Sequence, residues 1–139
     1  MHRFRIMIVI CVGLFLHDTL RANLPAAEWA RVGGTHKYDR YVDMTTIGVS
    51  GRRVTLWTLR DFRVERAIPR GPYRSLTIKR QYDCGQRKSR PLRARYYLDG
   101  MAQGFVLYAA PATREWSRVV PGSDDDVEMK VACRQAHRG

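Results

Sequence analysis

The sequence predicts a mostly β, α+β domain in which an antiparallel sheet carries one C-terminal helix, packed on it and linked to it by a disulfide. Short segments of alternating apolar and polar residues, separated by turn residues, are typical of strands. The end of the chain changes to a helical spacing of apolar residues behind a capping residue. Two cysteines, Cys84 and Cys133, fall on the apolar faces of a predicted strand and of the predicted helix.

The N-terminus has the features of a secretory signal peptide. A basic start precedes an unbroken apolar run of 11 residues, 6–16. A spanning helix needs about 20 residues, so the run is too short for an anchor. We expect residues 1–22 to be removed after Ala22 and 23–139 to form one domain, located in the periplasm, on the cell surface or outside the cell.

Two alternatives concern the processing of this segment. Cleavage after Ala26 or Ala27 would also follow a small residue. A lipoprotein would require a small residue before the modified cysteine at the end of the apolar run, whereas Cys11 follows Ile10 and has more apolar residues after it. Ordinary signal cleavage is therefore favoured. No later apolar run approaches the length of a membrane span.

Only Cys84 and Cys133 remain once the signal is gone. An even pair in an exported protein indicates a disulfide, because the compartment is oxidising. Closing a loop of about 50 residues would stabilise the domain by about 4 kcal/mol in the chain-entropy treatment. Two buried free thiols are the alternative.

The first half of the domain contains three predicted strands. Residues 28–32 form the first and end at a Gly-Gly pair, and residues 37–44, rich in Tyr and Val, form the second. The third, 52–62, follows the turn at Ser50-Gly51, and the proline-rich stretch 69–72 breaks the chain after it.

A hairpin and a further strand follow. Residues 74–84 alternate strictly, with Leu76, Ile78, Tyr82 and Cys84 on one face and Ser75, Thr77, Lys79, Gln81 and Asp83 on the other. Residues 85–91 are predicted to be a basic connection, and 92–98 alternate again. The stretch 100–104 is interpreted as a turn rather than a phosphate loop, and 105–110 is the last apolar segment.

The C-terminal helix has a clear start. Ser123 is a good N-cap with Asp126 three residues later, and negative charge in the first turn complements the helix dipole. The acidic run 124–126 is therefore interpreted as capping rather than catalytic. The apolar stripe consists of Met129, Ala132, Cys133 and Ala136.

The order of residues over 28–133 resembles the surface-adhesin protein E family of bacterial exported proteins. The matching pieces are Trp29 with Val32, Tyr41-Val-Asp43, Ile47, Val54-Thr-Leu-Trp57, Asp61, Ser75, Tyr82-Asp-Cys84, Arg90, Leu92, Gly100, Gly104, Trp116, Val119, Pro121-Gly-Ser123 and Ala132-Cys133. The resemblance implies a six-stranded antiparallel sheet with a helix held by the Cys84–Cys133 bridge. It also implies adhesion to host matrix proteins such as vitronectin or laminin as one possible role.

Charge placement is the strongest functional signal. The formal charge is +12, and 14 of the 25 Arg and Lys lie between Gly51 and Tyr97 against three acidic residues. The candidate partner-binding residues are Arg87, Lys88 and Arg90 at the predicted hairpin tip and Lys79, Arg93, Arg95 and Tyr97 on its arms. Such a surface suits acidic proteins or sulfated glycans, and an ordinary solvated surface is the alternative. Nucleic acid is disfavoured because an exported protein rarely meets it.

No catalytic, metal or cofactor site is predicted. The mature chain has only His36 and His137, without zinc spacing, and no nucleophile motif. The tryptophans Trp29, Trp57 and Trp116 are interpreted as core or helix–sheet packing. The chain is therefore predicted to be an exported, adhesin-like binding module rather than an enzyme. The alternatives are a periplasmic inhibitor or envelope-maintenance factor and, less favoured, a hydrolase or basic nuclease built on distant residues.

Overall fold

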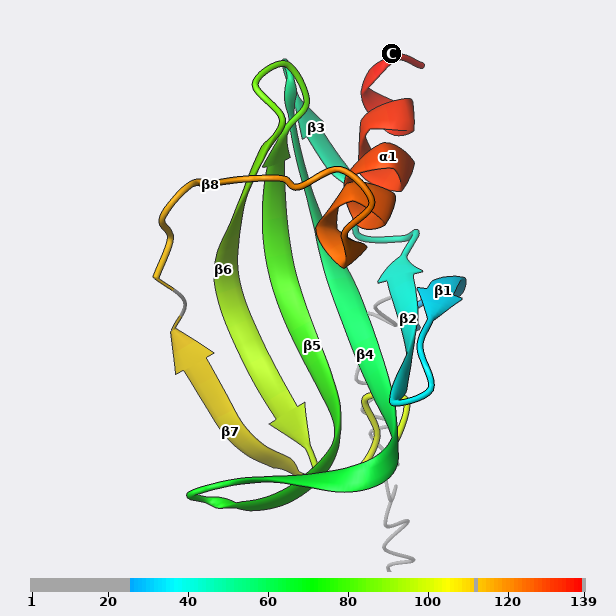
Figure 1. The fold of residues 1–139 in the computed structure, drawn as a ribbon, viewed down its shortest axis with the longest axis vertical. Coiled ribbons are helices and arrows are strands. Elements are labelled where there is room, and N and C mark those ends of the chain that lie inside the picture. The colour runs from blue at the N-terminus through cyan, green and yellow to red at the C-terminus, as the bar shows by residue number, and fades with distance from the viewer. Residues whose placement is uncertain (1–25, 112, 139) are drawn as a thin grey trace, which may run out of the picture.

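The computed structural model describes residues 26–111 and 113–138, so the predicted signal peptide and Cys11 lie outside the described residues. Its six main strands form one antiparallel sheet in the order β1-β2-β4-β5-β6-β7 (Figure 1). These strands are β1 (Trp29–Gly34), β2 (Tyr38–Asp43), β4 (Arg53–Ile68), β5 (Gly71–Asp83), β6 (Lys88–Tyr97) and β7 (Val106–Pro111). Two short strands not predicted from the sequence, β3 (Gly48–Ser50) and β8 (Ser117–Arg118), pair with β4 and β6.

The helix α1 (Asp124–Ala136) covers one end of one face of the sheet (Figure 1). Met129 and Ala132 pack on a cluster of strand residues that includes Val42, Val54 and Leu56, all three without exposed surface. Burial of these side chains supplies the main hydrophobic stabilisation of the helix, because an isolated helix of this length is marginal in water. The apolar stripe predicted for the helix is thus confirmed.

The disulfide between Cys84 and Cys133 joins the turn after β5 to α1, with 5.8 Å between the two Cα atoms. The predicted pairing and the predicted fold class, a mostly β protein with a helix linked to its sheet, are both confirmed. The bridge fixes the helix near its C-terminal end, while its first turn is held by polar contacts described below.

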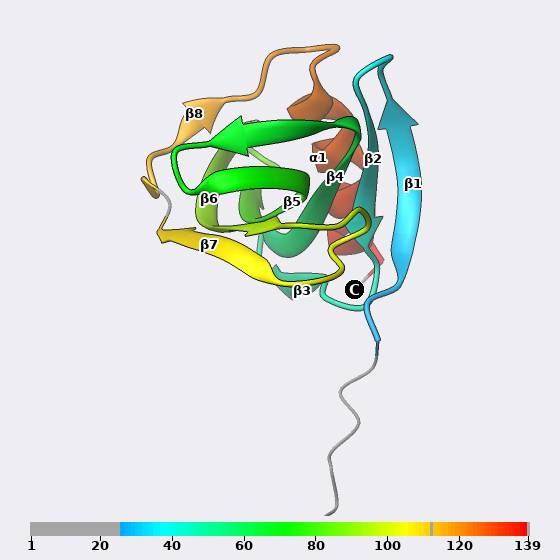
Figure 2. The same ribbon diagram turned by 90° about the horizontal axis from the view of Figure 1, so that it is seen from below.

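The β4–β5 hairpin is longer than predicted and covers the rest of the helix-bearing face. The expected end of the strand at Phe62 is wrong, because β4 continues to Ile68 through a register shift between Asp61 and Arg66. The strand bends there, and Figure 2 shows the bent end lying across the lower end of the sheet. The aromatic side chains of Phe62 and Tyr73 pack with Leu76 in a second core cluster.

The loop between β6 and β7 lies on the opposite face of the sheet. The backbone N–H of Met101 donates to the carboxylate of Asp61 at 2.9 Å, and that of Ala102 donates to Oγ of Ser75 at 2.9 Å. The predicted turn at 100–104 is therefore confirmed, and its contacts hold it against the face that the helix does not cover.

Candidate partner-binding face

A bulge in β6 determines where the predicted basic residues point. Lys79 of β5 pairs with Arg93, but the next pair is Arg80 with Pro91, so Leu92 is an extra residue in β6. Without the bulge, strict alternation would place the side chains of Lys88 and Arg90 on the face of the sheet opposite to that of Arg93. Residues that pair across β5 and β6 share a face. With the bulge, one row of β6 side chains therefore points away from the helix: Lys88, Arg90, Arg93, Arg95 and Tyr97.

We call this surface the basic face and define it by Lys79, Lys88, Arg90, Arg93, Arg95 and Tyr97. Lys79 belongs to it because it pairs directly with Arg93. The predicted connection 85–91 is corrected here, because β6 begins at Lys88 and only residues 84–87 form the turn. Six of the seven predicted residues therefore lie together in β5 and β6, and Arg87 is the exception.

Two arginines of the basic face stack on tryptophan rings. The guanidinium carbon of Arg95 lies 4.8 Å from the ring centroid of Trp57. That of Arg90 lies 4.5 Å from the ring of Trp116, while its Nε and Nη2 donate to Oε1 of Gln81 at 2.9 and 2.7 Å. Stacking orients the guanidinium of Arg95, and stacking together with hydrogen bonding holds that of Arg90 in a fixed orientation at the surface.

The interpretation of the tryptophans as core or helix–sheet packing is wrong. In β4, Leu56 and Thr58 are buried on the helix side, and Trp57 between them must point to the other face. Trp29 and Trp57 line one pocket there, and Trp116 lies against Arg90. All three half-buried rings accompany the basic face, a placement that the alternation around Trp57 could have indicated.

Arg87 is the only residue of the predicted set that is tied to the helix. It lies in the β5–β6 turn with a φ of 50°. Its Nη2 donates to Oδ1 of Asp126 at 2.8 Å, and Asp126 is only 2% exposed. Half of the Arg87 side chain remains exposed, so its guanidinium both anchors the helix and borders the surface.

The three consecutive aspartates of the helix start each pair with a different arginine. Asp124 pairs with Arg40 of β2, Asp125 with Arg80 of β5, and Asp126 with Arg87, at 3.2, 3.3 and 2.8 Å. The predicted N-cap is confirmed, because Oγ of Ser123 accepts the backbone N–H of Asp126 at 3.2 Å. The acidic run thus caps the helix and also neutralises cations of the covered side.

A second buried polar contact lies deeper under the helix. The hydroxyl of Tyr82 donates to Oε2 of Glu128 at 3.0 Å, and both side chains are almost fully buried. Burial raises the pKa of the Glu128 carboxyl and raises that of the Tyr82 hydroxyl well above its usual value. This pair was not found from the sequence, because a glutamate in a helix start normally faces water.

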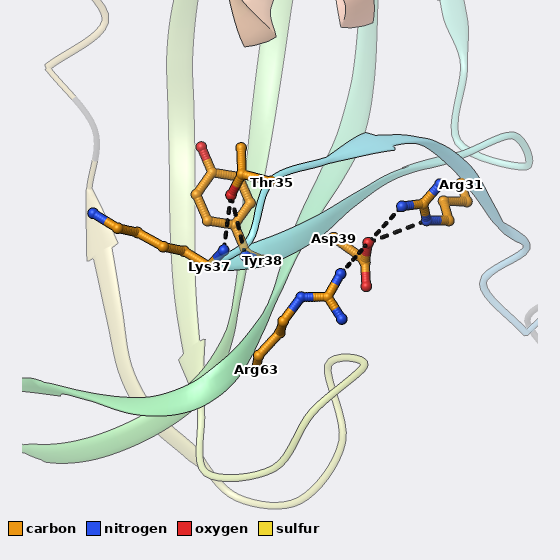
Figure 3. Close-up of polar contacts among 6 residues, drawn as sticks. All are labelled: Arg31, Thr35, Lys37, Tyr38, Asp39 and Arg63. Atoms are coloured by element: carbon orange, nitrogen blue, oxygen red, sulfur yellow. Dashed lines mark hydrogen bonds and ion pairs between the residues drawn. The ribbon is translucent and has the colours of Figure 1, made fainter.

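A third group of charges surrounds Asp39 on β2 (Figure 3). Its Oδ1 accepts hydrogen bonds from Nη2 of Arg31 at 2.7 Å and Nη2 of Arg63 at 3.2 Å. The hydrogen bond from Arg31 is the main cause that lowers the pKa of Asp39. The arrangement shows, within the protein itself, two arginines converging on one carboxylate.

The two histidines lie in different parts of the domain. His36 is in the β1–β2 turn, and His137 caps the C-terminus of α1; they border separate hollows. Among residues 26–111 and 113–138, no group of three His, Cys, Asp or Glu side chains is placed to hold a metal ion. In the same described part of the chain, no helix is long and apolar enough to cross a membrane.

Comparison with known proteins agrees with this geometry. The model of the family described as surface-adhesin protein E matches residues 29–134. A crystal structure of protein E from non-typeable Haemophilus influenzae has a TM-score of 0.61 at 13% identity, covering 85% of this chain and 82% of that one. A second structure of Haemophilus influenzae protein E has a TM-score of 0.58 at 13% identity, covering 81% and 96%. No curated protein sequence matches the chain.

Proposed function

Because this chain belongs to the surface-adhesin protein E family, we propose that it is an exported, adhesin-like binding module of the bacterial cell envelope or surface. The basic face is the proposed contact surface. Its proposed partners are acidic proteins, host matrix proteins among them, or sulfated glycans, since arginine pairs with carboxylate and sulfate in a bidentate manner.

One contrast between the two faces carries this proposal. Cations on the covered side are neutralised internally, as the pairs with Asp124, Asp125 and Asp126 demonstrate. Within residues 26–111 and 113–138, every salt bridge of 4.0 Å or less involves a cation other than the five of the basic face. Like charges held close together repel one another, and an acidic partner would relieve this repulsion.

Retention on a heparin column tests the proposal with matched variants. The double variant Lys88→Ser/Arg93→Ser removes two charges from the basic face. The control, Arg134→Ser/Arg138→Ser, removes two exposed charges from the C-terminal end of the helix region. The first variant should elute at clearly lower salt than the parent and the control. Equal shifts for both variants would mean that only total charge matters, and the basic face would lose its special role.

The salt dependence of heparin binding gives a second test of the proposal. Binding of the parent to heparin should weaken as salt rises to physiological levels, where the Debye length is about 8 Å. If heparin affinity falls less steeply with salt for Lys88→Ser/Arg93→Ser than for the control, the two charges belong to the contact. An unchanged slope would contradict that assignment.

Export and partner class complete the proposal. N-terminal sequencing of the protein from its native host should find residues 1–22 removed, and a mature chain beginning at Met1 would contradict export. The alternative role as a periplasmic inhibitor or envelope-maintenance factor would use the same face on another exported protein. A pull-down with the processed domain from envelope extract and from host matrix extract distinguishes the two roles, because each predicts capture from only one extract.

A further inference from the structure

A pocket of about 270 Å³ lies beside the basic face, under the β6–β7 loop. Three aromatic side chains, one each from β1, β4 and β6, line it together with polar side chains, and the loop supplies one further side. Its lining includes Trp29, Trp57, Thr77, Arg95, Tyr97 and Asp43. The volume is at the small end of ligand pockets and fits a ligand of one ring rather than an extended one.

The hydroxyl of Thr77 lacks a hydrogen-bond partner among the described residues. The side chain is only 3% exposed, and it lines the pocket. Leaving a buried hydroxyl unpaired is costly, and such groups in native proteins call for an explanation. This oxygen is closed to solvent, and a ligand hydroxyl or acid group in the pocket would supply the missing partner once the Thr77 side chain turns toward it.

Arg95 lies directly opposite Thr77 in the sheet, on the same face. Its guanidinium is 4.8 Å from the ring centroid of Trp57, which orients its donors without using a carboxylate inside the protein. The donors of a guanidinium group match the two oxygens of an acid group. The pocket therefore combines one fixed cation with one unpaired hydroxyl.

The aromatic walls and Asp43 favour a sugar ring over a bare anion. The faces of aromatic rings carry partial negative charge and attract the weakly positive C–H groups of a pyranose. Asp43 accepts hydrogen bonds at Oδ1 from the N–H of Glu28 and from the N–H and hydroxyl of Thr45. Its other oxygen, Oδ2, is the natural acceptor for a sugar hydroxyl in the pocket.

The loop that lines one side of the pocket is held in a fixed conformation. Met101 and Ala102 both have φ values in the left-handed region, 54° and 58°, which non-glycine residues rarely adopt. Their backbone N–H groups are fixed by Asp61 and Ser75. Strain of this kind persists where surrounding contacts impose it and is concentrated at binding sites.

We propose that this pocket binds a single acidic pyranose, a uronic acid unit, with its carboxylate on Arg95 and its ring against the tryptophans. The inference rests on the proposed function, because it assigns one specific site within a face that contacts acidic partners. Charge along Lys88 and Arg93 would then give general attraction, while the pocket selects the chemical unit.

Tryptophan fluorescence of the processed full-length domain tests the pocket, because two of its walls are Trp29 and Trp57. Methyl glucuronide should produce a saturable change with a dissociation constant on the order of 1 mM, the range expected for a ligand of this size. Methyl glucoside should bind several-fold more weakly. Arg95→Gln should remove the preference for the acid, and Thr77→Val should weaken both sugars several-fold.

Two controls keep this result separate from the heparin test. Arg93→Gln, which removes an exposed charge outside the pocket lining, should lower heparin retention and leave methyl glucuronide binding unchanged. Thr77→Val should keep a melting temperature at least equal to that of the parent, since it removes an unpaired buried hydroxyl.

Three outcomes would overturn the pocket assignment while leaving the heparin result intact. The first is the absence of a saturable change with methyl glucuronide. The second is an equal response to sodium acetate, which would indicate a bare anion site. The third is tighter binding of the tripeptide Gly-Glu-Gly than of methyl glucuronide, which would indicate a peptide site. If the parent domain binds methyl glucuronide but is not retained on heparin, only the proposed function is overturned.

Discussion

Arg87 donates a hydrogen bond of 2.8 Å to the buried carboxylate of Asp126, and this contact joins the β5–β6 turn to the first turn of α1. The backbone carbonyl of Arg87 also accepts the N–H of Val119 at 2.9 Å. One turn residue thus connects the sheet, the segment after β7 and the helix. Replacing it has consequences for folding that replacing its basic neighbours does not have.

Arg87→Ser should lower the free energy of unfolding, because it removes a cation from a carboxylate that stays buried. Arg93→Ser, on an exposed position of the same hairpin, should change it by no more than about 0.5 kcal/mol. Urea unfolding of the two variants measures the difference. Equal stability of both would show that Lys130 and the backbone alone satisfy Asp126.

The stability of the domain should fall between about pH 4 and pH 2. The backbone N–H of Gly122, then Lys130 and Arg87, lower the pKa of Asp126 from 3.8 to about 2. A carboxyl with a lowered pKa in the folded state stabilises it above the unfolded pKa, and this stabilisation is lost as the pH falls through the folded value. Melting temperatures across this range should decline more steeply for the parent than for Asp126→Asn, and parallel curves would contradict the assignment.

Tyr82→Phe should destabilise the domain by about 1–3 kcal/mol, because it leaves the buried carboxyl of Glu128 without its hydrogen-bond donor. The double variant Tyr82→Phe/Glu128→Leu should recover much of the loss, since both polar groups are then removed. Chemical unfolding of the single and double variants gives the coupling energy. If the two substitutions are additive, the contact contributes nothing of its own.

Cys133→Ser should destabilise the domain by about 2–5 kcal/mol, the usual range for a native disulfide in a small secreted domain. The bridge closes a loop with a sequence separation of 49 residues. Thermal unfolding of the variant, compared with that of the chemically reduced parent, should show similar losses. Peptide mapping without reductant should recover the linked Cys84–Cys133 pair, and two alkylated thiols would contradict it.

The sequence predicted features that depend on local pattern. Strand alternation in 74–84 identified the face of Leu76 and the opposite face of Lys79 correctly. The N-cap at Ser123 followed from residue type and spacing, since capping is decided within one turn of helix. The lower part of β4, beyond Phe62, was missed because its bend depends on pairing with β5 rather than on its own residues.

The candidate site was likewise predicted in part from the sequence and in part only from the structure. Composition, and the concentration of arginine between Gly51 and Tyr97, indicated a basic surface from the sequence alone. Only the tertiary structure decided that Lys88 and Arg90 lie on the same face as Arg93, because one extra residue at Leu92 reverses the side-chain alternation of β6 relative to β5. It also assigned Arg87 to the helix and left the hydroxyl of Thr77 buried without a partner, since such environments are made by residues distant in sequence, which periodicity within one strand cannot relate.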